Sequence, residues 1–137
     1  MTALSATERT RLRRSQDKGR SDRASLSEVL SAGFICHLGV IVDGAPMVVP
    51  TAYGFDDEHV YVHGSVASRS LTRSDATICI TVTIVDALVL ARSVFEHSVN
   101  YRSAMIYGVP RVVTDPTEKL EALRILTERA VPGQWDY

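Results

Sequence analysis

The sequence has few residues of the kinds that mark secreted, zinc-binding or membrane proteins. It contains two cysteines, Cys36 and Cys79, without CxxC spacing, so neither a disulfide framework nor a zinc ribbon is predicted. No apolar run reaches the roughly 18 residues of a membrane span, and no hydrophobic signal region follows the N-terminal charges. We therefore expect reduced thiols, no membrane association and a cytoplasmic location.

An excess of charge of either sign is also missing. Fifteen Lys and Arg residues against sixteen Asp and Glu residues give a net charge of -1, so nucleic acid is not expected as a partner. Basic residues are frequent only near the N-terminus, where a solvated arm and a segment that folds over a bound anion or a partner subunit both stay open. They are Arg9, Arg11, Arg13, Arg14, Lys18, Arg20 and Arg23.

Motifs with fixed catalytic spacing are absent as well. The four histidines, His37, His59, His63 and His97, form no HExxH or His-x-His pattern, so no protein-bound metal is expected. No GxSxG segment, Rossmann glycine pattern or P-loop occurs. These absences argue against a zinc hydrolase, a serine hydrolase and the common nucleotide-binding folds.

What is present is an ordinary globular composition. The 137 residues are 45% hydrophobic and 23% charged, which suits one domain with one core. We expect a polar basic arm over residues 1–20 and a folded domain over residues 21–137.

Short apolar, β-branched segments predict a series of strands. Residues 34–43 end at Asp43-Gly44, the strongest short-range hairpin signal, and residues 47–55 return as a second strand. About six strands at hairpin spacing predict a closed or partly closed antiparallel barrel, because closure removes exposed edges. The other expected strands cover residues 59–63, residues 76–85 with both faces buried, residues 88–92 and residues 101–114.

A first helix is predicted over residues 22–32. Ser21 or Ser25 is expected to cap it, since Ser25 and Glu28 have capping-box spacing, and Gly33 is expected to end it.

A second helix has the clearest signal in the chain. Asp115 is a capping residue, Pro116 suits the first helical position, Glu118 completes a capping box, and the apolar spacing stops before Pro132. The predicted fold class is therefore mainly β with flanking helices (α+β).

The segment VHGSVASRSL, residues 62–71, joins the third strand to a short helical turn. Gly64 permits a sharp turn, and Ser65, Ser68 and Arg69 follow it. Free backbone NH groups, two hydroxyls and a guanidinium suit a phosphate monoester. A second interpretation stays open, in which a serine merely caps a connecting helix and Arg69 pairs with a carboxylate.

Two other segments combine polar or unpaired backbone groups with apolar strands. In residues 98–103, Asn100 and Arg102 are two positions apart, so they lie on the same face of a strand and could meet a polar ligand. A solvent-facing start of a strand would explain part of the same pattern. Pro50 interrupts a strand-like run and marks a bulge or an edge, where backbone groups of Val49 and Thr51 could bind a planar heterocycle.

In this order the segments resemble the pyridoxamine 5′-phosphate oxidase-like superfamily, and within it the branch related to nitroimidazole-resistance proteins. The resemblance covers nearly the whole chain, and its most specific part is the pair HGSxxSR and HSxNYRS, which begin at His63 and His97. It implies an antiparallel split β-barrel of the FMN-binding type. It also implies a homodimer with FMN in a cleft at each subunit boundary.

The resemblance further implies roles for individual residues. Ser68 and Arg69 would hold the FMN phosphate, with Ser65 and His63 beside it. The isoalloxazine edge would run along the strand with Val48, Val49, Pro50 and Thr51. A later segment would approach the cofactor, either in the same subunit or from across the subunit interface, with Ser98, Asn100, Tyr101 and Arg102.

The chain departs from this family at its C-terminus. It stops at QWDY, where relatives usually continue through another segment, so we expect either a shortened form or an incomplete cofactor site. The C-terminal substrate-binding Arg and His of true pyridoxamine phosphate oxidases have no counterpart, so vitamin B6 oxidation is not expected.

The leading hypothesis is an FMN-dependent oxidoreductase, a flavin reductase or nitroreductase-like enzyme. It would pass electrons from a nicotinamide or deazaflavin donor to a small aromatic or nitro compound. His63 is the candidate proton donor, because imidazole titrates near neutral pH, with a purely structural histidine as the alternative. A flavin-binding module without efficient turnover and a haem-binding module stay open as other functions.

Overall fold

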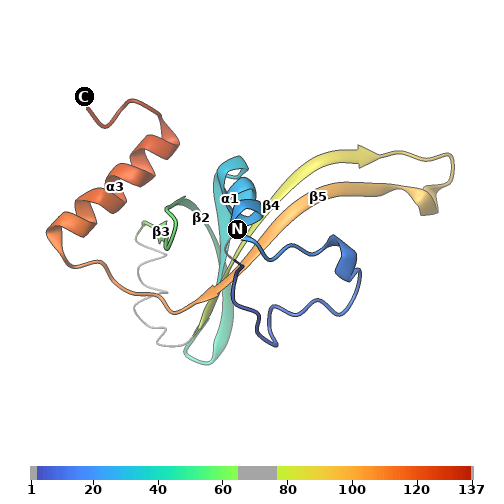
Figure 1. Cartoon of the computed structure of the whole chain (residues 1–137), viewed down its shortest axis with the longest axis horizontal. Helices are drawn as coiled ribbons and strands as arrows, with labels where there is room; N and C mark the ends of the chain where they lie inside the picture. Colours follow the sequence, from blue (N-terminus) through green and yellow to red (C-terminus); the bar gives the residue numbers. More distant parts are fainter. Residues whose placement is uncertain (1–2, 65–76, 137) are drawn as a thin grey trace. The chain divides into compact units, whose positions relative to one another are not determined.

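A computed structural model of the chain describes residues 3–64 and 77–136. Within them, five strands form one sheet in the order β3-β2-β1-β4-β5 (Figure 1). The strands are β1 (Ile35–Val42), β2 (Ala45–Phe55), β3 (Val60–Val62), β4 (Ile78–Val89) and β5 (Ser98–Gly108), and the helices are α1 (Arg23–Ala32) and α3 (Pro116–Ala130). Short 3₁₀ turns cover Gln16–Lys18 and Val94–Glu96.

The chain divides into two compact units. The hairpin unit consists of Met1–Gly33 and Val82–Met105, and the sheet unit consists of Phe34–Thr81 and Ile106–Tyr137. The sheet unit contains β1, β2, β3 and α3, whereas most of β4 and β5 belongs to the hairpin unit.

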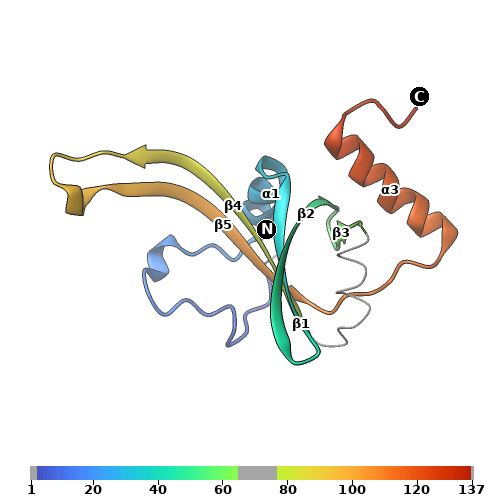
Figure 2. The same cartoon turned by 180° about the vertical axis from the view of Figure 1, so that it is seen from behind.

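The β1–β2 hairpin forms as predicted (Figure 2). Asp43 and Gly44 both have positive φ, 51° and 77°, which matches a two-residue turn of type I′. Pairing is continuous from Ile35 with Ala52 to Val42 with Ala45, so no extra residue is inserted at Pro50 and the predicted bulge is wrong. Pro50 lies on a sheet edge instead, the other expected possibility, because in the described part of the chain residues 45–52 of β2 pair with β1 alone.

The core of the sheet unit lies on one face of the sheet. Cys36, Leu38 and Val40 alternate along β1 and are at most 4% exposed, and Tyr53 and Ile80 join them from β2 and β4. Both cysteines are free thiols. Burial raises the pKa of Cys36 to about 11, so this thiol is protonated and unreactive at neutral pH.

Strands β4 and β5 differ from the prediction in burial and in length. Ile78, Ile80 and Val82 are buried, but Cys79 and Thr81 between them are half-buried and most residues beyond Val82 are exposed, so β4 is not buried on both faces. The predicted strand at 88–92 is the continuation of β4 to Val89, and β5 stops at Gly108 because Pro110 offers no NH for a ladder bond.

The two helices begin and end close to the predicted residues. The cap of α1, however, is Asp22 and not Ser21 or Ser25, because its carboxylate accepts hydrogen bonds from both the backbone NH (2.9 Å) and the hydroxyl (2.8 Å) of Ser25. Asp115 caps α3 as expected. No helix in the described ranges is long and apolar enough to cross a membrane.

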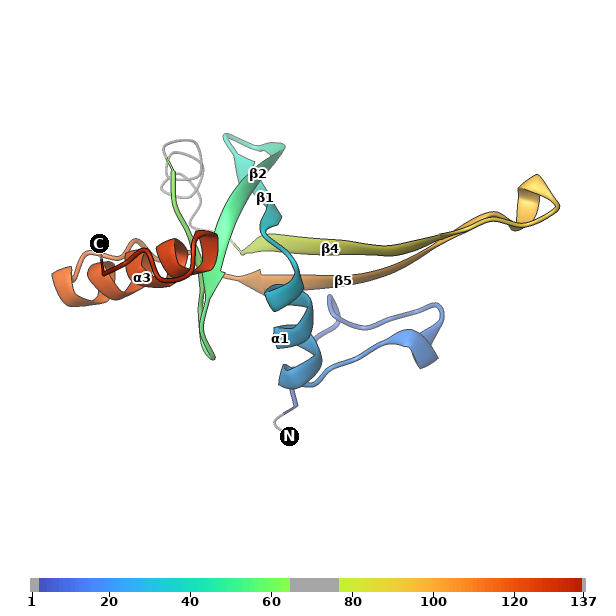
Figure 3. The same ribbon diagram turned by 90° about the horizontal axis from the view of Figure 1, so that it is seen from above.

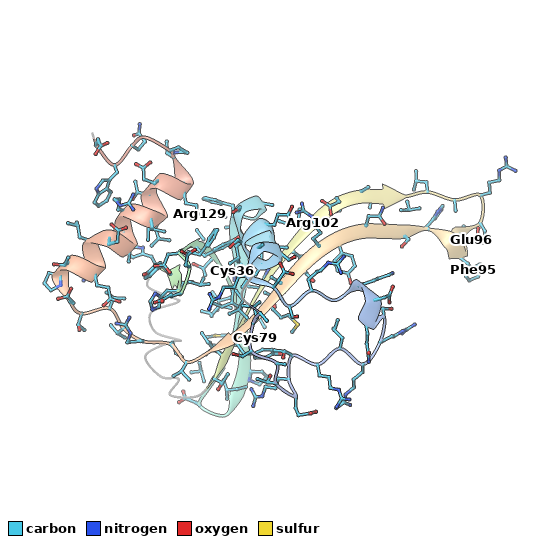
Figure 4. The ribbon with its side chains drawn as sticks, in the orientation of Figure 1. Cys36, Cys79, Phe95, Glu96, Arg102 and Arg129 are labelled. Carbon is cyan, nitrogen blue, oxygen red and sulfur yellow. The ribbon has the colours of Figure 1, made fainter. Side chains whose placement is uncertain are left out.

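Helix α3 is attached to β2 through Arg129 (Figure 4). The Arg129 Nε donates to the backbone carbonyl of Tyr53 at 3.2 Å. Its guanidinium carbon lies 4.7 Å and 5.0 Å from the ring centroids of Tyr53 and Phe55. These contacts fix the helix against the strand that carries Val48–Thr51 of the predicted site.

Candidate functional site

The face of the sheet unit opposite the core carries no Asp, Glu, Lys or Arg where β1, β2 and β4 pair. His37 of β1 pairs with Pro50 of β2 and with Thr81 of β4, and directly paired residues share a face. Gly39 pairs in the same way with Val48 and Cys79. We call these six residues the open face; they are His37, Gly39, Val48, Pro50, Cys79 and Thr81.

Small and apolar side chains make the open face suitable for a planar ring. Val48 is 65% exposed, and Gly39, at the centre of the three strands, has no side chain above the sheet. Cofactor sites are concave and mainly apolar with a few placed polar groups, so the open face could form one apolar wall of such a site.

The predicted cofactor strand, Val48 to Thr51, contributes to this surface in part. Side chains alternate along β2, so Val48 and Pro50 lie on the open face, whereas Val49 and Thr51 lie on the face of Cys36 and Leu38. Only the backbone of Val49 and Thr51 is therefore able to meet a ligand on the open face.

Two predicted site residues are brought together, Thr51 of β2 and His63, which directly follows β3. The Thr51 hydroxyl donates to the backbone carbonyls of Ala52 (3.3 Å) and His63 (3.4 Å). Gly64 follows with φ of 133°, the sharp turn expected from the sequence. The remaining residues of this segment, Ser65, Ser68 and Arg69, lie outside the described residues.

The predicted residues of β5 belong to the hairpin unit. Ser98, Asn100 and Arg102 alternate onto one face of β5, and Tyr101 lies on the other. These four side chains therefore do not all meet one ligand on a single face of the strand.

Arg102 is already paired within the hairpin unit. Its Nε and Nη2 donate to the carboxylate of Asp86 at 3.0 to 3.2 Å, and this hydrogen bonding raises the pKa of Arg102. The sequence analysis missed Asp86, and the signal available was a single acidic residue inside the otherwise uncharged strand β4. Any anion bound by Arg102 shares the guanidinium with this carboxylate.

A polar cluster closes the turn between β2 and β3. The Asp56 carboxylate accepts hydrogen bonds from the backbone NH of Glu58 (2.8 Å) and of His59 (2.7 Å) and from the hydroxyl of Tyr61 (2.8 Å). Burial raises the pKa of Asp56, but these bonds outweigh it, and the net pKa is below the ordinary value. Burial and the bond to Asp56 raise the pKa of Tyr61 to about 12.

This cluster predicts a pH-dependent contribution to stability. Because the folded-state pKa of Asp56 is depressed, its stabilisation is present above about pH 4 and is lost as the pH falls through the folded value. Asp56→Asn is expected to lower the free energy of unfolding at pH 7 by under about 1 kcal/mol, since the carboxylate is partly exposed. Urea unfolding at pH 7 and pH ~3 measures the difference. A loss of equal size at both pH values, or the same loss in the neighbouring Glu58→Gln control, would contradict this account.

Comparison with known proteins decides which family this fold and site represent. The family model described as pyridoxamine 5′-phosphate oxidase matches residues 22–137. The chain belongs to this family. No curated protein matches the chain.

Solved structures similar to this family member confirm the antiparallel split β-barrel. The flavocytochrome Anf3 from Azotobacter vinelandii is 34% identical with a TM-score of 0.85, covering 95% of this chain and 61% of that one. The FAD and haem binding protein from Mycobacterium smegmatis is 33% identical with a TM-score of 0.74, covering 82% and 56%. A putative 5-nitroimidazole antibiotic resistance protein from Bacteroides thetaiotaomicron is 26% identical with a TM-score of 0.70, covering 85% and 70%.

These matches confirm the resemblance inferred from the sequence, including the branch related to nitroimidazole resistance. The chain spans 61% of the Azotobacter protein and 56% of the Mycobacterium protein.

Proposed function

We propose that this family member binds FMN and acts as a flavin-dependent oxidoreductase on a small aromatic or nitro compound. The observation that carries the proposal is the junction of β2 with the segment after β3. There the stretch of β2 that contains Val48–Thr51 pairs with β1 alone, and the Thr51 hydroxyl at its end reaches the backbone of His63. The relatives described as a flavocytochrome and as an FAD and haem binding protein support a flavin as the cofactor class.

The residues of the chain suit the chemical parts of a flavin. Gly39, Val48 and Pro50 offer an apolar surface for the ring, and the sequence HGSVASR offers hydroxyls and a guanidinium for the phosphate. Bound flavin would supply the redox chemistry, and the protein supplies binding, orientation and access. His63, exposed and fixed through its carbonyl to Thr51, is the group proposed to hold or donate a proton.

We also propose that the cofactor lies between two copies of the chain. Ser98, Asn100, Tyr101 and Arg102 would then approach it from the second copy, as the family resemblance implies. A small-molecule substrate and a cytoplasmic location complete the proposal, and the free thiols Cys36 and Cys79 suit a reducing compartment.

Turnover separates the oxidoreductase from a flavin-binding module. Flavin-loaded protein is mixed with a nicotinamide donor, or with a deazaflavin donor, and a nitroaromatic acceptor, and donor oxidation is followed by absorbance. The oxidoreductase predicts acceptor-dependent oxidation by at least one donor. Yellow protein that oxidises no donor would overturn the enzymatic part and leave a flavin-binding module.

Haem binding is the second candidate, because two relatives above 30% identity are described as a flavocytochrome and as an FAD and haem binding protein. His37 is the residue of this chain that fits best, since it is exposed on the open face among apolar neighbours. His97 suits the role less, because its Nδ1 accepts a hydrogen bond from the Ala91 NH and a neutral imidazole then carries its proton on Nε2. A Soret band lost in His37→Ala and kept in His97→Ala would support this candidate.

A further inference from the structure

The basic residues near the N-terminus lie in a closed loop. The Leu4 NH donates to the Ser21 carbonyl at 2.7 Å, and Ala3 and Asp22 form an isolated β-bridge. The segment therefore begins and ends beside the first turn of α1 (Figure 3). We call residues 4–21 the basic loop. All of its basic residues are exposed, namely Arg9, Arg11, Arg13, Arg14, Lys18 and Arg20.

The outer end of the basic loop is closed by contacts of its own. The Leu12 side chain covers Gly19, where an added Cβ would overlap the Leu12 Cδ1. Between these two residues the chain turns through Ser15, whose φ of 50° is left-handed and uncommon for a residue other than glycine. The Lys18 NH then donates to the Ser15 carbonyl at 3.0 Å. We call residues 13–18 the loop end, and its cations are Arg13, Arg14 and Lys18.

The charge of the basic loop is largely uncompensated. The Arg11 Nη1 lies 3.6 Å from the Glu8 carboxylate, but both side chains are mostly exposed, so this pair contributes little. The three cations of the loop end form no ion pair with any residue that the structure describes. Six basic residues against Glu8 and Asp17 give the loop a net charge of +4, so the rest of the chain, whose total is -1, carries -5. An anion is therefore attracted to the basic loop and repelled elsewhere.

The composition of the basic loop favours a compact phosphate group over a long polyanion. No residue of the loop is aromatic, so the bases of a nucleic acid have no ring on which to stack. A long polyanion would also meet the negative remainder of the chain. Exposed Arg and Lys side chains, in contrast, bind a terminal phosphate well, because arginine offers paired NH donors and lysine a mobile charge.

The basic loop belongs to the part of the chain that carries the cofactor-side residues of β5. It leads directly into α1, and both lie in the hairpin unit with most of β5. Hydrogen bonding to Asp86 raises the pKa of Arg102 most, and the nearby charge of Glu28 on α1 adds to it, so α1 lies close to β5. A phosphate ligand that also visits the proposed cofactor is the electron donor.

We propose that the loop end binds the 2′-phosphate of a phosphorylated nicotinamide donor, so that the protein uses NADPH in preference to NADH. The inference rests on the proposed function and names its donor. The two donors differ only in the phosphate on the adenosine ribose, a group that an arginine near the ribose commonly recognises. The nicotinamide ring gives its hydride to the flavin and leaves oxidised, while the 2′-phosphate stays intact, so the loop raises affinity without entering the chemical step.

The kinetic test compares the two donors with the same nitroaromatic acceptor and flavin-loaded protein. Wild type is expected to have a KM for NADPH at least ~10-fold below that for NADH. The double variant Arg13→Gln, Arg14→Gln should raise the KM for NADPH roughly tenfold and leave the KM for NADH and both kcat values within about twofold. Arg92→Gln is the control, because Arg92 is an exposed arginine of the hairpin unit without an ion pair among the described residues. Equal KM values of wild type for the two donors, or equal effects of the double variant and the control, would overturn the proposal.

A binding test separates this site from turnover. The protein is titrated in a calorimeter with adenosine 2′,5′-bisphosphate and with adenosine 5′-monophosphate, and ~10-fold tighter binding of the bisphosphate is expected in wild type and not in the double variant. This preference in protein that oxidises no donor would support the phosphate site and contradict the proposed enzyme, whereas turnover without any preference would contradict the site alone. Circular dichroism and flavin absorbance are read for each variant. Loss of flavin from the folded double variant would assign the loop to the flavin site and overturn the proposal.

Discussion

Arg69→Ala is expected to weaken FMN binding roughly ten- to hundredfold. The reason is the loss of a charge-assisted hydrogen bond to the phosphate, worth about 1.5 to 3 kcal/mol. Arg69 lies outside the described residues, so this expectation rests on the sequence HGSVASR and on the family. A fluorescence titration of the flavin-free protein with FMN measures the affinity.

Two controls separate the phosphate contact from general positive charge. Arg69→Lys keeps the positive charge but loses the bidentate hydrogen bonding of the guanidinium, so an intermediate affinity for FMN is expected. Arg73→Ala removes a neighbouring arginine of the same segment to which no role is assigned, and full affinity is expected. Affinity unchanged in Arg69→Ala, or lowered equally in Arg73→Ala, would remove Arg69 from the site.

Gly54→Val is expected to destabilise the fold by about 2 to 3 kcal/mol, because α3 lies directly over this position. A Cβ at Gly54 would lie 2.9 Å from the Cγ2 of Ile125 and 3.3 Å from the backbone nitrogen of Leu126. The backbone atom does not rotate away, so the helix itself must shift from β2. Thermal unfolding should show a midpoint lower by about 10 °C.

Gly108→Val is the matched control for Gly54→Val. It places the same side chain at the end of β5, where an added Cβ meets no atom within 4 Å in the described part of the chain. We expect a change within about 0.5 kcal/mol. Equal losses in both variants would show that valine in place of a strand glycine, and not the contact with α3, lowers stability.

Features set by local chemistry were predictable from the sequence. Asp43-Gly44 specifies its turn because two consecutive residues must adopt positive φ, and Asp115-Pro116 specifies a helix start by capping and fixed φ. The cap of α1 was misassigned, because Asp22, Ser21 and Ser25 all have capping side chains and only the three-dimensional position selects one.

Features that depend on packing were not predictable. Apolar and β-branched residues fill β4 from Ile78 to Val85, and this composition is the same for a strand buried on both faces and for one whose far end is exposed. The ion pair of Arg102 with Asp86 and the contacts of Arg129 with Tyr53 join residues distant in sequence, and no local pattern signals them. For the candidate site, the resemblance named the residues, and the structure showed which of them share a face.

The most direct test of the account is the absorption spectrum of the purified protein, followed by the mass of the small molecule released from it. We expect the two visible bands of an oxidised flavin and a released mass equal to that of FMN. The mass of FAD would correct the cofactor while keeping a flavin site. Protein that stays colourless after incubation with either flavin would contradict the central claim.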